Sequence, residues 1–218
     1  MQFSQEHLML LVGLAVVAVI GIAFYLDWKR GNDLAALAAS MGLPFSKYGP
    51  DPSAVENTRL ELFGMGRSRS ASNLVEIALP SGQLQVFDYK FTTGGGKNSH
   101  THTFTLALFT CTRCDIPYFD LKPETVMYKL GEFVGFKDID LPAFPVFSDK
   151  YRLTGPDEGA VRMFFNPDRA AWFERNQGLH AQGAPGYGLL FKKEGRLPVD
   201  AWQTFIEEAK TFAAEALK

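Results

Sequence analysis

The first marked pattern along the chain is an uninterrupted apolar run from Leu8 to Leu26. It contains no charged residue. As a helix it would be about 28 Å long, close to the roughly 30 Å hydrocarbon core of a bilayer. A cleaved signal peptide is the alternative, but that needs basic residues before the run and a small-residue cleavage site after it. Residues 1–7 contain no Lys or Arg, and Asp27 follows the run, so the sequence predicts an uncleaved transmembrane helix.

Residues at the end of the run predict how the helix lies in the membrane. Lys29 and Arg30 follow it, whereas its N-terminal side has neither residue type. The positive-inside rule then predicts an external N-terminus and a cytoplasmic C-terminal part. Tyr25 and Trp28 are typical of an interfacial aromatic belt. A stripe of small residues would let another helix approach, although scattered small residues are equally typical of a lipid-facing helix: Ala15, Ala18 and Gly21.

Beyond the anchor, alternating apolar and polar positions predict an antiparallel sheet. The strongest strands are 83–93 and 101–110, which are rich in β-branched and aromatic residues and flank a glycine-rich loop. Pairing Thr93 with His100 gives one face an apolar row, because it sets three pairs: Phe91 with His102, Tyr89 with Phe104 and Phe87 with Leu106. Further strands are predicted at 59–63, 73–79, 150–153, 179–182 and 187–192.

Start signals and three-and-four spacing predict the helices. Asn32 or Asp33 begins a short helix that ends at Met41, and Pro198 opens a final amphipathic helix. Other helices are predicted over 125–133 and after Pro156 and Pro167, and a turn is predicted at 80–82. These elements divide the chain into a membrane anchor over 1–30 (span 8–26), a short helix with a proline-containing connector over 31–57, and a soluble domain over 58–218. The predicted fold class is α+β, an antiparallel sheet covered by helices on one face.

Composition narrows the protein classes further. The 218 residues carry a net charge of −2, with 46% hydrophobic residues, 21% charged residues and two Cys. Intrinsic disorder combines low hydrophobicity with high net charge, and a disulfide scaffold needs more cysteines, so neither fits. A nucleic-acid-binding protein usually shows a basic excess, which this chain lacks.

Two motifs suggest chemistry that their surroundings do not support. The loop 94–97 resembles a phosphate-binding loop, but Asn98 replaces the required hydroxyl and a strand follows instead of a helix. Cys111 and Cys114 form a C-x-x-C pair. A redox-active pair of this kind lies at the start of a helix, and no helix is predicted to begin here. Zinc would need two more ligands, and His102 lies roughly 30 Å away along a continuous strand. We therefore expect two reduced thiols in a loop.

Four polar residues on the two central strands form a candidate ligand site. His100 and His102 lie two apart and are suited to a proton relay or a ligand pair, while Asp88 and Lys90 share one face of their strand. Half-exposed histidines beside aromatic rings and an exposed salt-bridge ladder are the alternatives. Catalytic motifs are absent from the sequence, so we predict no catalytic, cofactor-binding or metal-binding residue and no cofactor.

Three stretches of the sequence resemble a family of uncharacterised bacterial single-pass membrane-anchored proteins: 34–45, 87–104 and 144–165. The resemblance covers much of the chain after the anchor and implies the same anchored architecture. The family has no assigned activity, so the resemblance implies no catalytic residues. Similar proteins do not show the C-x-x-C pair, which argues against a core role for Cys111 and Cys114.

These observations predict a non-catalytic accessory or scaffolding subunit of a larger bacterial membrane complex, by analogy an energy-transducing one, respiratory or photosynthetic. Its expected partners are integral membrane proteins and the lipid bilayer, with no nucleic acid, and its expected place is the inner membrane. The alternative is a membrane-tethered enzyme, or a sensor of a small ligand or lipid headgroup, using the hairpin around His100 and His102. A deep polar pocket would favour the alternative.

Overall fold

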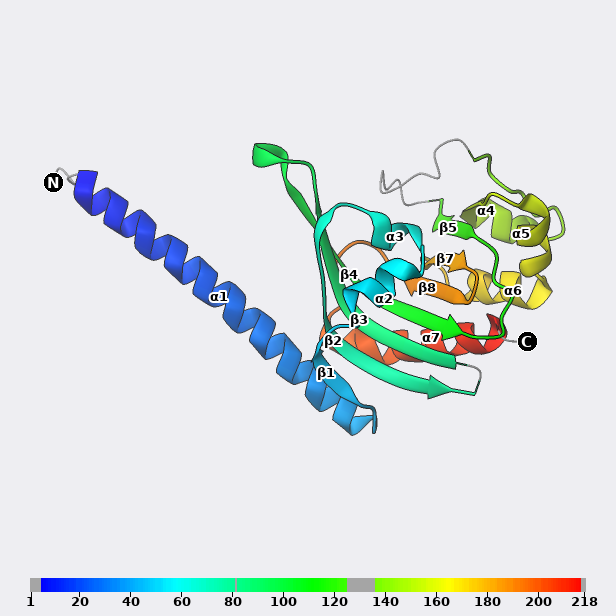
Figure 1. Cartoon of the computed structure of the whole chain (residues 1–218), viewed down its shortest axis with the longest axis horizontal. Helices are drawn as coiled ribbons and strands as arrows, with labels where there is room; N and C mark the ends of the chain where they lie inside the picture. Colours follow the sequence, from blue (N-terminus) through cyan, green and yellow to red (C-terminus); the bar gives the residue numbers. More distant parts are fainter. Residues whose placement is uncertain (1–4, 81, 125–135, 217–218) are drawn as a thin grey trace.

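The fold is built on one antiparallel sheet (Figure 1). The computed structural model describes residues 5–80, 82–124 and 136–216 and orders eight strands as β1-β2-β3-β4-β8-β7-β5-β6. The helix predicted over 125–133 and the middle of the turn predicted at 80–82 lie outside these residues. The strands are β1 (Phe45–Tyr48), β2 (Arg67–Leu79), β3 (Gly82–Thr93), β4 (His100–Cys111), β5 (Phe119–Pro123), β6 (Tyr151–Thr154), β7 (His180–Ala184) and β8 (Tyr187–Phe191).

Helices cover both faces of the sheet. One face packs against the end of α1 (Gln5–Ser40) and against α4 (Pro145–Lys150), α5 (Glu158–Phe164), α6 (Pro167–Arg175) and α7 (Trp202–Ala216). The opposite face packs against α2 (Pro52–Asn57) and α3 (Glu61–Gly64). Two short 3-10 helices, η1 (Gly96–Asn98) and η2 (Val199–Ala201), complete the described elements. The α+β prediction is confirmed, but the expectation of a single covered face is wrong.

The second helical layer includes a segment for which the sequence pattern predicts a strand. Residues 59–63 were expected to form a strand, whereas α3 occupies this stretch and buries Leu62 and Phe63 against the sheet. Within the predicted connector, Asp51 caps α2 by accepting a hydrogen bond from the backbone N–H of Ser53, and Pro52 occupies the first turn. Burial of two apolar side chains on one side of a single helical turn outweighs the strand propensity of the local sequence.

The central hairpin has the predicted register. Thr93 pairs with His100, Phe91 with His102 and Phe87 with Leu106. Because successive side chains alternate between faces, Phe87, Tyr89 and Phe91 point toward α2 and α3, whereas Asp88 points toward α1 and α7. The tip of this hairpin extends beyond the rest of the sheet, on the same side as the N-terminal end of α1 (Figure 1).

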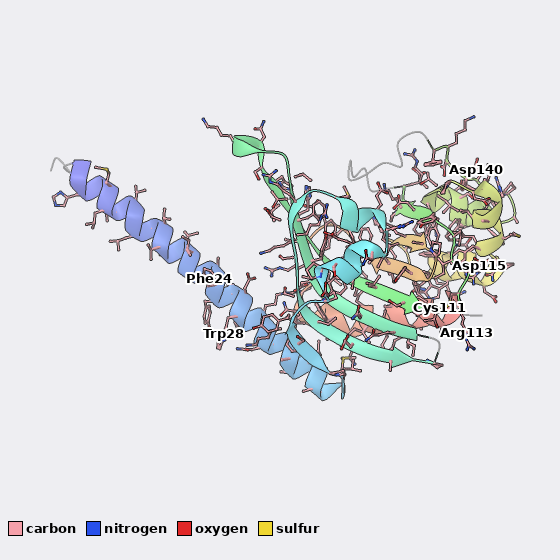
Figure 2. The ribbon with its side chains drawn as sticks, in the orientation of Figure 1. Phe24, Trp28, Cys111, Arg113, Asp115 and Asp140 are labelled. Carbon is pink, nitrogen blue, oxygen red and sulfur yellow. A yellow bond between two sulfur atoms is a disulfide. The ribbon has the colours of Figure 1, made fainter. Side chains whose placement is uncertain are left out.

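Helix α1 (Gln5–Ser40) is continuous, although the sequence predicts a separate helix from residue 32. From Met9 onward it is long and apolar enough to cross a membrane. Phe24 is 74% exposed and projects away from the domain (Figure 2), whereas Leu34 and Ala38 are buried against the sheet. The helix continues because its last turns gain a packing surface on β1 and β2.

The two cysteines form a disulfide, so the expectation of reduced thiols is wrong. Cys111 is the last residue of β4 and is buried, and the chain then turns so that the Cα atoms of Cys111 and Cys114 lie 5.6 Å apart. This separation lies within the range for disulfides. Figure 2 places Cys111 and Arg113 at the end of the sheet remote from the exposed part of α1.

Candidate functional site

The junction between the anchor and the domain centres on a buried ion pair. Arg30 of α1 donates two hydrogen bonds to the Asp88 carboxylate of β3, Nε to Oδ2 at 2.7 Å and a terminal nitrogen to Oδ1 at 2.9 Å. Asn73 Nδ2 and Thr105 Oγ1 donate to the same carboxylate, each at 2.9 Å. Asp88 is 3% exposed, so its charge is compensated almost entirely by these protein groups.

Local backbone features bring these partners together. The pairing of β2 with β3 shifts register between Ser72 and Val75, and Asn73 lies within this bulge with a φ of 57°. Asn tolerates the left-handed region better than most residues. Gly31 lets α1 approach, because a Cβ at this position would lie 3.2 Å from the Asn73 side chain. The bulge therefore positions the amide of Asn73 between the helix and Asp88.

A polar cavity of about 470 Å³ adjoins this ion pair, between α1 and the sheet. Trp28, Lys47, Lys90 and Thr103 contribute to its lining, and the ion pair between Arg196 and Asp27, at 2.7 Å, lies at its edge. Lys47 and Lys90 form no ion pair with any residue that the structure describes. The cavity therefore combines two uncompensated ammonium groups with hydroxyl groups and an indole ring.

The cavity lies at the level where the helix leaves the apolar span. Leu26 is the last residue of the uncharged run, and Asp27, Trp28 and Gly31 line the cavity within the next helical turns. At 1.5 Å per residue, Gly31 is about 7 Å beyond Leu26 along the helix axis, comparable to the thickness of one headgroup layer. Tyr25 and Trp28, with ring centroids 6.1 Å apart, lie at the same level.

The second polar group lies on the opposite face of the sheet. His102 Nδ1 lies 2.9 Å from Glu194 Oε1, and His100 Nε2 lies 3.4 Å from the same oxygen. His102 also forms a hydrogen bond through Nε2 with Thr93 Oγ1 at 2.8 Å, and its ring stacks on Phe91. One carboxylate therefore contacts both hairpin histidines.

The predicted ligand residues thus lie in two places. Asp88 and Lys90 face α1, whereas His100 and His102 face the other side of the sheet. The two pairs diverge because successive side chains along β3 and β4 point to opposite faces. Sequence reasoning missed Glu194, Arg30 as a partner of Asp88, and Asn73. Their spacing from the hairpin carries no local pattern, although the sequence does show an arginine four residues after the apolar span and an aspartate in the middle of a predicted strand.

The small-residue stripe lies on the exposed part of α1. Ala15, Ala18 and Gly21 are all exposed, and a Cβ at Gly21 would meet no atom within 4 Å. The stripe is therefore open to lipid or to another helix.

A third polar cluster joins α3 to the sheet. Gln182 Nε2 donates to Asp120 Oδ1 at 2.9 Å, and its Oε1 accepts from the backbone N–H of Leu62. Burial, with a contribution from the negative charge of Asp120, raises the pKa of Glu61 to about 7. Burial also raises the pKa of Asp120, although Lys122 at 3.0 Å opposes the shift. These groups connect the two layers and do not line the junction cavity.

Comparison with known proteins identifies the fold. No protein-family model and no curated protein sequence matches the chain. A solved structure does match. The crystal structure of the mycobacterial trehalose monomycolate transport factor A, TtfA, is similar with a TM-score of 0.59 and 10% sequence identity, over 85% of this chain and 93% of that chain. At this identity the similarity establishes the shared α+β fold.

Proposed function

We propose that this protein is a non-catalytic, single-pass accessory or scaffolding subunit that holds its domain in a fixed orientation beside a larger bacterial membrane complex. The observation that carries the proposal is the continuity of α1, locked to the sheet by the Arg30–Asp88 pair. A flexible linker would let a tethered domain sample many orientations. A single helix whose end is buried in the domain prevents such sampling, which suits a subunit that presents one surface to a partner.

Two further observations support the proposal. The structural neighbour is a transport factor, which favours a transport-related membrane assembly over the energy-transducing kind suggested by analogy. The exposed stripe of Ala15, Ala18 and Gly21 offers a surface for an integral membrane partner. Lys29 and Arg30 favour a cytoplasmic domain at the inner membrane, whereas the disulfide is more typical of an oxidising compartment. We propose the cytoplasmic orientation, which labelling of single cysteines on either side of the membrane tests.

Co-purification from mild detergent tests the proposal. Replacing Ala18 and Gly21 together by Leu should reduce recovery of the partner complex, because bulky side chains prevent close helix approach. Val16→Leu with Ile20→Leu is the matched control, since these exposed residues lie on the opposite side of α1. Recovery of the wild-type protein as a lone monomer, with no partner after crosslinking at native expression, would reject the accessory-subunit function.

The junction cavity supports a second candidate, binding of an anionic lipid headgroup. Lys47 and Lys90 line the cavity together with residues that directly follow the apolar span, and neither forms an ion pair with a described carboxylate. In this candidate the sensor site lies on the α1 face and uses Lys47 and Lys90 in place of His100 and His102. Lys47→Gln with Lys90→Gln should weaken the preference for phosphatidylglycerol over phosphatidylcholine in nanodiscs, whereas Lys210→Gln, remote on α7, should not. An equal preference in all three proteins would reject this candidate.

A further inference from the structure

The cluster next to the tip of the central hairpin has the composition of a metal site. His100 and His102 are two apart on β4 and therefore project to the same face, and Glu194 follows β8. One ligand atom from each of the three residues lies within 4.8 Å of the other two. The donors are two imidazole nitrogens and one carboxylate oxygen, a set that binds zinc and related divalent transition metals.

The surrounding contacts hold two of the three donors in place. The His102 ring is fixed from one side by stacking on Phe91, with ring centroids 4.9 Å apart, and through Nε2 by the hydroxyl of Thr93. Such a partner on the second ring nitrogen orients the ring of a metal-binding histidine. The backbone next to Glu194 is fixed as well, because Gly195 N–H donates to the Thr103 carbonyl at 2.7 Å.

The contact between His102 and Glu194 can be bridged by a proton or by a metal ion. His102 Nδ1 and Glu194 Oε1 lie 2.9 Å apart, and two lone pairs at this distance would repel each other. Either a proton on Nδ1 or a bound cation must lie between or beside them. A bound metal ion would replace a proton on Nδ1: the ring proton would then lie on Nε2 and be donated to Thr93, and Nδ1, the carboxylate and His100 would all face the ion.

We propose that His100, His102 and Glu194 bind one divalent transition-metal ion, zinc by their donor set. Three protein ligands leave a coordination position open, and the 66% exposure of the His100 side chain places that position at the solvent side. The cysteines considered as zinc co-ligands from the sequence form a disulfide at the opposite end of the hairpin and are not part of this site. The ion would tie the hairpin to the segment that leads from β8 to α7, and so stabilise the part of the sheet that projects farthest (Figure 1).

Zinc titration by calorimetry tests the site. The probe is Zn²⁺ alone, added to the full chain in detergent, without a polyhistidine tag, stripped with EDTA and with the disulfide intact. We expect saturable binding of one ion per chain and a melting temperature that rises with zinc, because the ion binds only the folded arrangement. His100→Ala and Glu194→Gln should abolish both effects. Thr93→Val should weaken affinity by about 10–100-fold, since it removes the contact that orients His102.

Controls separate this site from nonspecific zinc binding. His7→Ala and Glu207→Gln remove a histidine and a carboxylate outside the cluster and should leave the affinity unchanged. His100 is exposed, so its replacement tests the site even where a change at His102 disturbs folding. The proposal is overturned by the absence of saturable binding in the wild type, or by unchanged affinity in both His100→Ala and Glu194→Gln. Co-purification with a membrane partner does not depend on either result.

Discussion

Arg30 and Asp88 form a bidentate, buried ion pair although 58 residues separate them along the chain. Arg30 lies just past the apolar span, and Asp88 lies in the middle of a central strand. The arginine thus serves two purposes. It contributes to the positive charge that flanks the membrane helix, and it connects that helix to the interior of the domain. The guanidinium also lies 5.9 Å from the centre of the Trp202 ring, which links the anchor to α7.

Breaking this pair should destabilise the domain strongly. Arg30→Met leaves the Asp88 charge buried with only Asn73 and Thr105 as partners, so we expect a loss of about 3–5 kcal/mol. Urea unfolding followed by intrinsic fluorescence measures it. Lys29→Met is the control on the same helix, because its pair with Asp33 is exposed to solvent, which screens the two charges, and its loss should change stability little. Similar losses for the two variants would contradict a structural role for Arg30.

The position at which the anchor is removed should determine the stability of the remaining domain. A chain that begins at Asp27 keeps Arg30 and should fold as a soluble domain. A chain that begins at Gly31 lacks the arginine and should be less stable by about 3–5 kcal/mol. Chemical denaturation of the two truncated proteins provides the comparison. If their midpoints coincide, the ion pair does not couple the anchor to the domain.

Titration of Glu61 should make stability depend on pH. Its pKa is raised from 4.5 to about 7 in the folded state, so the unfolded chain loses its proton first as pH rises. Ionisation of Glu61 therefore lowers the free energy of unfolding between about pH 4.5 and 7, and the loss is complete above pH 7. Glu61→Gln removes this contribution, so the variant should gain stability relative to wild type across this range.

The buried His180 makes stability depend on pH in the opposite direction to Glu61, so the two contributions must be separated. Burial lowers its pKa from 6.5 to about 4, so the unfolded state binds a proton first as pH falls, and stability decreases from about pH 6.5 to 4. The difference between wild type and Glu61→Gln cancels this shared contribution. Unfolding free energies of wild type and Glu61→Gln at pH 5 and pH 8 are sufficient to measure this difference. A difference that does not grow with pH would contradict the raised pKa of Glu61.

The orientation of the chain should be open to direct labelling. In a Cys-free variant with a single Cys in place of Gln2, we expect an impermeant maleimide to label intact cells, because Lys29 and Arg30 favour a cytoplasmic domain. A Cys in place of Lys210 on α7 should label only after lysis. The reverse pattern would place the domain in an oxidising compartment, where the disulfide between Cys111 and Cys114 would be expected.

Sequence reasoning succeeded where the information is local. The β3–β4 register follows from alternation over two adjacent strands, and all the predicted pairs, such as Phe91 with His102, are present. Sequence reasoning failed where contacts between distant segments determine the local structure or the site. Helix α3 forms because Phe63 has a buried site on the sheet, and Glu194 reaches His102 across 92 positions. Pairings of this kind leave no periodic signal in a single sequence, since they depend on how separate elements meet.

The unbroken α1 has a mechanical consequence for the domain. Membrane helices tilt by about 20° on average, and the tilt follows bilayer thickness and neighbouring helices. Since Leu34 and Ala38 fix the end of α1 to the sheet, the domain must turn with the helix as a lever arm. The position of the hairpin tip relative to the lipid surface is then set by the angle of the span. A thinner or thicker bilayer changes where this domain can reach.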